Sequence, residues 1–163
     1  MFKIFKALNQ AKIRYLVAGG VAINLHGIER ATADLDLIIH LEVPNVLKFA
    51  KLMTRLGYQP KVPVKAEDLA DPEKRKSWID EKNMIVFSFI NPKEPQELID
   101  IFVQHPLPFE GMYKRKAGKK ALGTVIPVLS IDDLIVLKKR AGRPKDIFDL
   151  GYLMPLAKRN KND

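Results

Sequence analysis

The sequence predicts an α/β protein in which strands and helices alternate along the chain. Short apolar runs with the length of buried strands are separated by longer segments whose apolar residues recur at helical spacing. Glycine and proline mark the points where one pattern changes into the other. The chain of 163 residues has the length of one domain, and we expect a core over about 13–130 followed by C-terminal helices over about 130–158.

The N-terminal half contains the clearest change from strand to helix. The apolar run Tyr15-Leu16-Val17-Ala18 stops at two glycines, and helical spacing begins directly after them. Further on, a proline opens a third helix and Gly57 ends it. We expect a helix over 2–12, a strand over 15–18, a helix over 21–26, a strand over 34–40 and a helix over 44–56.

The second half begins with a polar segment rich in proline, over about 60–82, which predicts a surface excursion with a short helix. Strand patterns follow, and the turn-rich segment 91–95 can join two antiparallel neighbours. Ser130 has the position of an N-cap, with Asp133 three residues later. The expected elements are strands over 84–90, 97–104 and 124–129, a helix over 131–141 and a last helix that begins at Pro144.

Two of these helices have a predicted apolar side that should face the core. In the helix over 44–56 that side consists of Val46, Leu47, Phe49, Ala50, Leu52, Met53 and Leu56. In the last helix it consists of Ile147, Phe148, Leu150, Leu153, Met154 and Leu156.

Two carboxylates lie two residues apart in the segment Asp34-Leu35-Asp36. Side chains at i and i+2 of a strand point to the same face, so Asp34 and Asp36 are aimed at one point. Such a pair suits a hard divalent cation, Mg²⁺ in particular when phosphates complete its ligands. A solvent-facing strand with two acidic residues is the alternative.

A third carboxylate lies in the middle of the apolar run Leu98-Ile99-Asp100-Ile101-Phe102. An isolated buried carboxylate is costly, and a metal or a basic partner would relieve the cost. If this strand lies beside that of Asp36, three carboxylates converge as in two-metal phosphoryl transfer. An edge-strand aspartate paired with arginine or lysine is the competing interpretation.

Gly19 and Gly20 separate a strand from a helix, where backbone N–H groups can approach phosphate oxygens. From these two residues alone, a tight structural turn is the better explanation. Arg30 and Thr32 come just before the aspartates and could contact phosphate or orient a carboxylate. Thr32 shares the parity of the aspartates if the strand begins early. Arg30 could equally be a surface residue.

A basic segment spans the end of one helix and the start of the next, with Lys138, Arg143 and Lys145 as candidate triphosphate ligands. Asp146 and Asp149 lie at i and i+3 on one side of the last helix and could orient these cations. The alternative is an internal salt-bridge network that ties the last two helices to the sheet.

Composition limits the partners. A formal charge of +9 favours anionic molecules such as nucleotides and nucleic acid, without specifying a contact. The absence of cysteine excludes disulfides and cysteine-bound zinc and fits a reducing cytoplasm. No apolar run approaches the roughly 18 residues that span a bilayer, so we expect a cytoplasmic protein without a membrane partner.

The assembled pattern resembles the nucleotidyltransferase superfamily related to DNA polymerase β. The resemblance rests on an apolar strand, the two glycines, a helix, the two close aspartates and a later strand with Asp100. More narrowly, residues 30–36 and 138–150, especially Arg143-Pro144-Lys145-Asp146, are similar to the small bacterial proteins related to the abortive-infection AbiEii nucleotidyltransferases. The similarity covers roughly residues 13–150.

The resemblance implies a palm-like central mixed sheet flanked by helices, with a C-terminal helical pair. It also implies transfer of NMP from an NTP to a hydroxyl of a small molecule, an RNA end or a protein, in a toxin–antitoxin setting. Asp34, Asp36 and Asp100 would hold Mg²⁺ or Mn²⁺, and Asp100 would accept the proton. Gly19 and Gly20 would seat the phosphates. The alternative is an inactive module of this fold that binds RNA or a partner protein through its basic surface.

Overall fold

A seven-stranded mixed sheet forms the centre of the protein in the computed structural model, which describes residues 3–163. The strands lie in the order β3-β4-β5-β2-β1-β7-β6. The pairs β2–β5 and β1–β7 are parallel, and the other neighbouring pairs are antiparallel. Their bounds are β1 (Tyr15–Ala18), β2 (Leu35–Ile39), β3 (Gln59–Pro60), β4 (Val86–Asn91), β5 (Glu94–Phe102), β6 (Ala117–Ala121) and β7 (Thr124–Val128).

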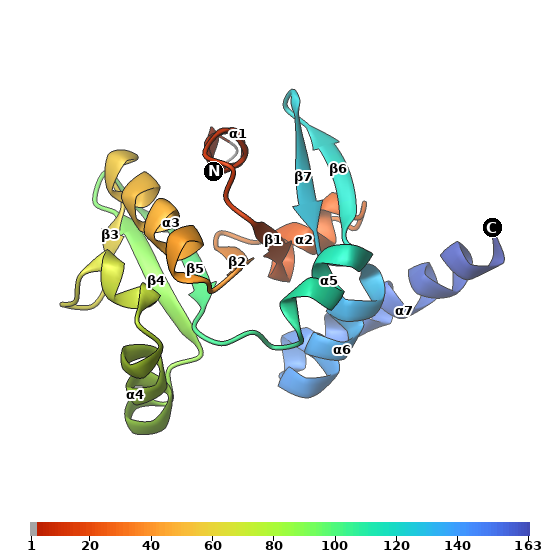
Figure 1. The fold of residues 1–163 in the computed structure, drawn as a ribbon. Coiled ribbons are helices and arrows are strands. Elements are labelled where there is room, and N and C mark those ends of the chain that lie inside the picture. The colour runs from red at the N-terminus through yellow and green to blue at the C-terminus, as the bar shows by residue number, and fades with distance from the viewer. Residues whose placement is uncertain (1–2) are drawn as a thin grey trace.

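Helices flank this sheet, so the predicted fold class is confirmed (Figure 1). Helices α3 and α4 lie beside the half of the sheet that contains β3 and β4, whereas α5, α6 and α7 gather near β1 and β7. The bounds are α1 (Lys3–Gln10), α2 (Gly19–Leu25), α3 (Val43–Arg55), the 3-10 helix η1 (Ala66–Ala70), α4 (Pro72–Lys82), α5 (Phe109–Arg115), α6 (Ile131–Ala141) and α7 (Pro144–Asn162). No helix within residues 3–163 is long and apolar enough to cross a membrane.

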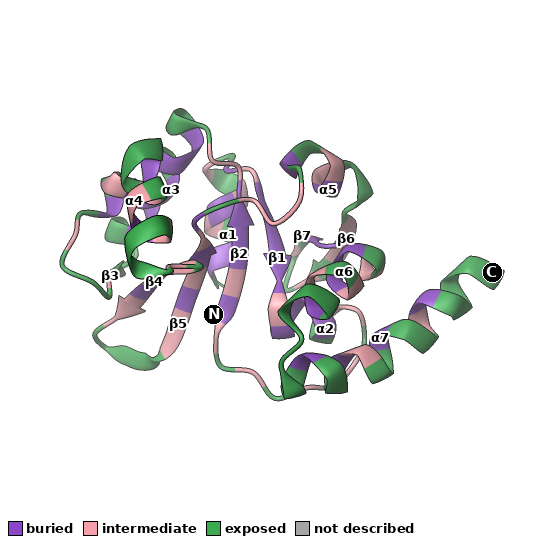
Figure 2. Ribbon diagram, turned by 90° about the horizontal axis from the view of Figure 1, so that it is seen from below, coloured by how far each residue is buried: buried purple, intermediate pink, exposed green. Residues whose placement is uncertain are grey.

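The core lies on the central strands, which are the most buried part of the chain (Figure 2). Strands β1 and β2 contribute fully buried residues along almost their whole length, as expected for strands covered on both faces. Aromatic side chains of β4, Phe87 and Phe89, pack against Trp78 and Phe49 of the flanking helices α4 and α3. Asp36 of β2 and Asp100 of β5 are thus carried by strands at the buried centre of the sheet.

The turn into the C-terminal helices follows the sequence prediction. Ser130 caps α6, because its Oγ accepts a hydrogen bond of 3.1 Å from the backbone N–H of Asp133. Gly142 ends the helix in the left-handed region with φ +61°. Pro144 then opens α7 in its first turn, as predicted.

Several boundaries differ from the prediction. Strand β2 begins at Leu35 and ends at Ile39, one residue inside the predicted range at each end, so Asp34 lies in the preceding loop. The strand does not begin early, and the condition under which Thr32 would share a face with the aspartates is not met. Helix α5 and strand β6 were not expected, because their basic, glycine-containing sequence lacks an apolar period. The predicted helix over 2–12 is α1, and its Phe2 lies outside the described residues.

The predicted apolar sides of α3 and α7 are only partly correct. Leu47 and Leu56 at α3 are exposed. On α7 the predicted core residues Ile147, Phe148 and Met154 are exposed, whereas the carboxylates Asp146 and Asp149 are buried together with Leu153 and Ala157. The end of α7 extends away from the rest of the molecule (Figure 1). The inward side of this helix therefore combines buried carboxylates in its first half with apolar residues in its second half.

Candidate active site

The two central carboxylates lie side by side on neighbouring strands. In the parallel pair β2–β5, Asp36 is the register partner of Asp100. Directly paired residues of neighbouring strands point to the same face of the sheet. Strand β5 lies between β4 and β2, so the interpretation of Asp100 as an edge-strand residue is wrong. Among residues 3–163, no arginine or lysine forms an ion pair with Asp100; a hydroxyl is its hydrogen-bond partner.

Asp36 is held in an environment that disfavours its negative charge. Burial and the neighbouring charges of Asp100 and Asp34 raise its pKa from 3.8 to about 6. Lys138 and Lys145 oppose this rise without cancelling it. A carboxyl group with a raised pKa beside a second carboxylate is typical of a cation-binding or catalytic site.

Asp34 lies one residue before β2, close enough for its charge to act on Asp36. Its backbone carbonyl accepts a hydrogen bond of 3.3 Å from the hydroxyl of Thr32, which fixes the loop ahead of the strand. Within residues 3–163 no three acidic, histidine or cysteine side chains form a group that could hold a metal ion. The structure therefore shows a pair of carboxylates, and Asp34 as a third ligand stays a prediction.

The glycine pair makes room for the side chains of the site itself. Gly19 is the first residue of α2 and has φ +61°, a conformation that side chains rarely adopt. A Cβ at Gly19 would overlap the carboxylate of Asp36, and a Cβ at Gly20 would overlap the side chains of Arg30 and Thr32. Glycine is therefore required at both positions by close packing. The predicted contact with phosphate is an additional role that stays a prediction.

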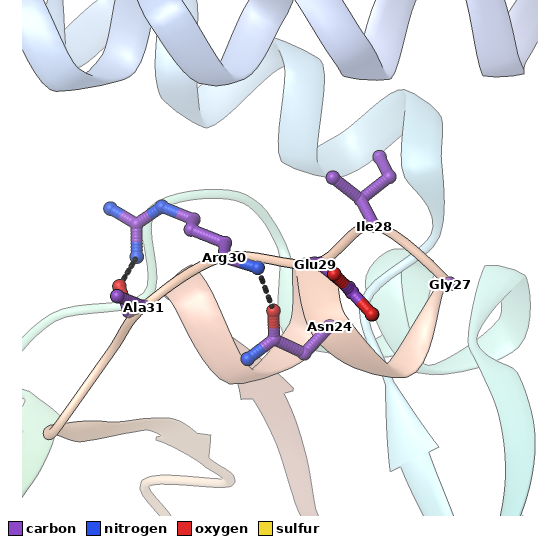
Figure 3. A pocket seen from close by; sticks show the side chains of 6 residues that line it. All are labelled: Asn24, Gly27, Ile28, Glu29, Arg30 and Ala31. Atoms are coloured by element: carbon purple, nitrogen blue, oxygen red, sulfur yellow. Dashed lines mark hydrogen bonds between the residues drawn. The ribbon is translucent and has the colours of Figure 1, made fainter.

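Arg30 is fixed at this edge of the site. Its Nε donates a hydrogen bond of 2.8 Å to Asp149 of α7, and its backbone N–H donates one of 2.9 Å to Asn24. Figure 3 shows the hollow beside it, where Ile28 points toward the C-terminal helices. This hollow is lined by Asn24, Gly27, Ile28, Glu29, Arg30 and Ala31. Neither Asp36 nor Asp100 lines this hollow.

A buried network of ion pairs ties α6 and α7 to this loop. The Nζ of Lys138 lies 2.9 Å from Asp146 and 2.8 Å from Asp149. Asp146 also pairs with Arg143 at 2.7 Å. Burial raises the pKa of Asp146, but hydrogen bonds from Arg143 and Lys138 outweigh it and hold the pKa at about 2. The structure thus shows the internal network that the sequence left as an alternative for Lys138 and Arg143.

Lys145 differs from these paired cations. It is exposed in the first turn of α7, and its charge acts on Asp36. Among residues 3–163, no carboxylate forms an ion pair with it. The predicted contact of Lys145 with a triphosphate therefore stays a prediction, whereas Lys138 and Arg143 are engaged in ion pairs.

A family model described as "Nucleotidyl transferase AbiEii toxin, Type IV TA system" matches residues 4–162, with the carboxylate pair and the basic start of α7 inside the match. The chain belongs to the AbiEii nucleotidyl transferase family. As a member it is a nucleotidyltransferase, with a nucleoside triphosphate as substrate. Family membership thus favours the enzyme over the inactive binding module. A comparison of the sequence with curated proteins finds no significant match.

Solved structures show the same fold at low sequence identity. The lincomycin-bound lincosamide antibiotic adenylyltransferase LnuA is 16% identical, with a TM-score of 0.61 and coverage of 94% of this chain and 93% of that one. ANT(2″)-Ia in complex with adenylyl-2″-tobramycin is 15% identical, with a TM-score of 0.66 and coverage of 98% and 88%. An antigenic nucleotidyltransferase-like protein from Paracoccidioides brasiliensis is 17% identical, with a TM-score of 0.59 and coverage of 94% and 72%. These likenesses support the fold.

Ser88 was not singled out from the sequence, although it contacts the site. It lies on β4, and its Oγ donates the hydrogen bond to Asp100. A serine between two phenylalanines of a strand carries no signal of its own. Only the register of β4 against β5 shows that it faces a carboxylate.

Proposed function

We propose that this nucleotidyltransferase transfers a nucleoside monophosphate to a hydroxyl acceptor at the carboxylate pair of β2 and β5. The observation that carries the proposal is the direct pairing of Asp36 with Asp100 on one face of the sheet. Each carboxylate lies beside another negative charge, and Asp100 has a neutral hydroxyl as its partner. Such an arrangement is stabilised when a cation binds between the two groups.

The residues fit a divalent metal with oxygen ligands, such as Mg²⁺ or Mn²⁺. Asp36 and Asp100 would hold it, Asp34 is the proposed third protein ligand, and phosphate oxygens of the substrate would supply others. The raised pKa of Asp36 supports this assignment, because a bound cation would favour its charged form. When bound, the metal stabilises negative charge on the phosphates and lowers the pKa of the acceptor hydroxyl.

The reaction exchanges one phosphorus–oxygen bond for another. The acceptor oxygen bonds to the α-phosphorus, the bond between that phosphorus and the bridging oxygen to the β-phosphate breaks, and pyrophosphate leaves. We assign Asp100 to receive the proton of the acceptor hydroxyl. Lys145 neutralises charge on the triphosphate, since it is exposed and acts on Asp36. We assign the backbone N–H groups of Gly19 and Gly20 at the start of α2 to the phosphates, while their missing side chains leave room for Asp36, Arg30 and Thr32.

We assign an indirect role to the cations that form ion pairs: they hold α7 and the loop before β2 in place around the substrate. Lys138 and Arg143 hold the buried carboxylates of α7, which keeps Lys145 at the site. Arg30 is anchored on Asp149 through its Nε and on Ala31 through its Nη1 at 3.4 Å, and we assign it to contact phosphate from this fixed position. Thr32 fixes the loop that carries Asp34.

The family description supports a toxin–antitoxin setting, in which the acceptor is a molecule of the cell. Lincomycin and adenylyl-2″-tobramycin are bound by the structurally similar proteins, and at such low identity they do not specify the acceptor of this chain. We propose an RNA end, a protein or a small molecule of the host as acceptor. Induced expression should then slow growth of a bacterial host, and Asp36→Asn should restore it at equal protein level.

Transfer can be measured directly with NTPs that are radiolabelled at the α-phosphate. Purified protein is incubated with Mg²⁺, each NTP, and separated RNA, protein and small-molecule fractions of a cell extract. We expect label to appear in one fraction together with pyrophosphate, and Asp100→Asn to abolish both. Asp132→Asn on the exposed part of α6 is the matched control. Full transfer by a folded Asp100→Asn variant would overturn the proposal.

A further inference from the structure

A row of polar side chains crosses the sheet at the level of the carboxylate pair. The register aligns Ser88 of β4 with Asp100 of β5, and Asp100 with Asp36 of β2. Asp36 in turn is the partner of Ala18, directly before Gly19. Since directly paired residues share a face and neighbouring strands are about 4.8 Å apart, Ser88 is the outer member of this row, beyond Asp100.

Ser88 binds Asp100 closely. Its Oγ donates a hydrogen bond of 2.6 Å to Oδ1 of Asp100, the short length expected for a hydroxyl on a carboxylate. The backbone of Ser88 is itself held, because its carbonyl accepts a hydrogen bond of 2.9 Å from the N–H of Lys61. Its neighbours Phe87 and Phe89 are buried in the core on the other face. The hydroxyl therefore has little freedom to leave the carboxylate.

One oxygen of Asp100 is thereby used. Among residues 3–163, Ser88 is the hydrogen-bonding side chain on Asp100, and it takes Oδ1 alone. On the opposite side of Asp100 lies Asp36. A carboxylate fixed through one oxygen presents the other in a defined direction, whereas a free aspartate would rotate about its side-chain torsions.

We propose that Ser88 is a positioning residue that fixes the Asp100 carboxylate, with Oδ1 held and Oδ2 free for the reacting groups. This inference rests on the proposed function, because it assigns Asp100 to the reaction. Ser88 does not touch the substrate in this arrangement. It lies on the far side of Asp100 from Asp36, so its own hydroxyl is not the acceptor.

Substitutions of Ser88 separate this role from a merely structural one. Ser88→Ala removes the hydroxyl, and Ser88→Thr keeps it on a residue well suited to a strand. Partners that orient the ligands of a site typically contribute about 10- to 100-fold to activity. We expect Ser88→Ala to lower kcat at least about tenfold with KM for the NTP nearly unchanged, and Ser88→Thr to recover most of the loss.

Ser77 on α4 provides a matched control, because it is the same residue type on a helix outside the row. Ser77→Ala should keep the kcat of the wild type. A thermal melt establishes that each variant is folded, and Ser88→Val provides a second β-branched residue without a hydroxyl. We expect Ser88→Val to behave like Ser88→Ala and unlike Ser88→Thr.

The outcomes distinguish this inference from the proposed function. If Asp100→Asn abolishes transfer but Ser88→Ala keeps the wild-type kcat, the role of Ser88 is overturned and the proposed function stands. If Asp100→Asn keeps full transfer, the proposed function itself is overturned. Mass spectrometry that finds a nucleotide on Ser88 after incubation with NTP would also overturn the positioning role, since the hydroxyl would then be an acceptor.

Discussion

Asp36→Asn should stabilise the metal-free protein at neutral and alkaline pH, although it removes a group from the proposed site. Burial, Asp100 and Asp34 raise the pKa of Asp36 from 3.8 to about 6, so ionisation of this carboxyl opposes folding. The pKa of Asp36 is higher in the folded state than in the unfolded state. The stability that the protonated carboxyl provides relative to the ionised one is therefore complete below about pH 4, and it is lost as pH rises through about 6. The asparagine variant has no such loss.

The magnitude follows from the shift of the pKa. One pKa unit corresponds to about 1.4 kcal/mol, so the rise to about 6 costs about 3 kcal/mol once Asp36 is fully ionised. At about pH 4.5 the cost is about 1 kcal/mol. The difference in unfolding free energy between variant and wild type should therefore change by about 2 kcal/mol in favour of the variant between about pH 4.5 and about pH 8.

Urea unfolding in EDTA at the two pH values measures this difference. Asp132→Asn, which replaces an exposed carboxylate, should show little change between them. A difference between Asp36→Asn and wild type that stays constant with pH would refute the account of Asp36. Mg²⁺ with an NTP should then stabilise the wild type more than the variant, because a ligand that binds only the folded state adds to its stability.

Two further substitutions test the packing around the pair. Gly19→Ala should lower the free energy of unfolding by about 2–4 kcal/mol, because it combines a strained φ with overlap on Asp36. Gly27→Ala is the control: its φ is +92° and the space around it is open, so it should cost about 1 kcal/mol. Equal losses in urea unfolding would contradict the overlap at Gly19. Asp149→Asn should cost about 2–4 kcal/mol, since its buried carboxylate serves two cations at 2.8 Å. Asp132→Asn, which breaks an exposed pair, should cost about 0.5 kcal/mol or less in the same urea unfolding experiment. A similar loss for Asp149→Asn and Asp132→Asn would show that the buried network contributes no more than a surface pair.

Local patterns predicted most of the elements that carry the site. The apolar run before the glycines is β1, and the serine, the glycine and the proline of the last two helices mark their ends as expected. These signals are local, because each depends on residues within one turn of one another. Asp36 and Asp100 were also found from sequence, since a carboxylate inside an apolar strand is unusual.

Sequence could not determine what depends on register or on burial of charge. Ser88 meets Asp100 only because β4 and β5 pair as they do, and neither strand encodes that register by itself. The prediction of which side of α7 faces inward was wrong for its first half. Asp146 and Asp149 are polar, but cations from other segments pair with them and allow them to be buried. The two glycines were predicted to approach phosphate, and the structure adds that they give room to neighbouring side chains.

Titration with Mn²⁺ in the presence of a non-hydrolysable NTP analogue, followed by electron paramagnetic resonance, tests most directly whether the carboxylate pair holds a metal. The wild type should bind Mn²⁺ saturably, and Asp36→Asn and Asp100→Asn should each weaken this binding strongly, while Asp132→Asn should not. Equal Mn²⁺ binding by the wild type and both folded site variants would contradict the assignment of the metal to β2 and β5.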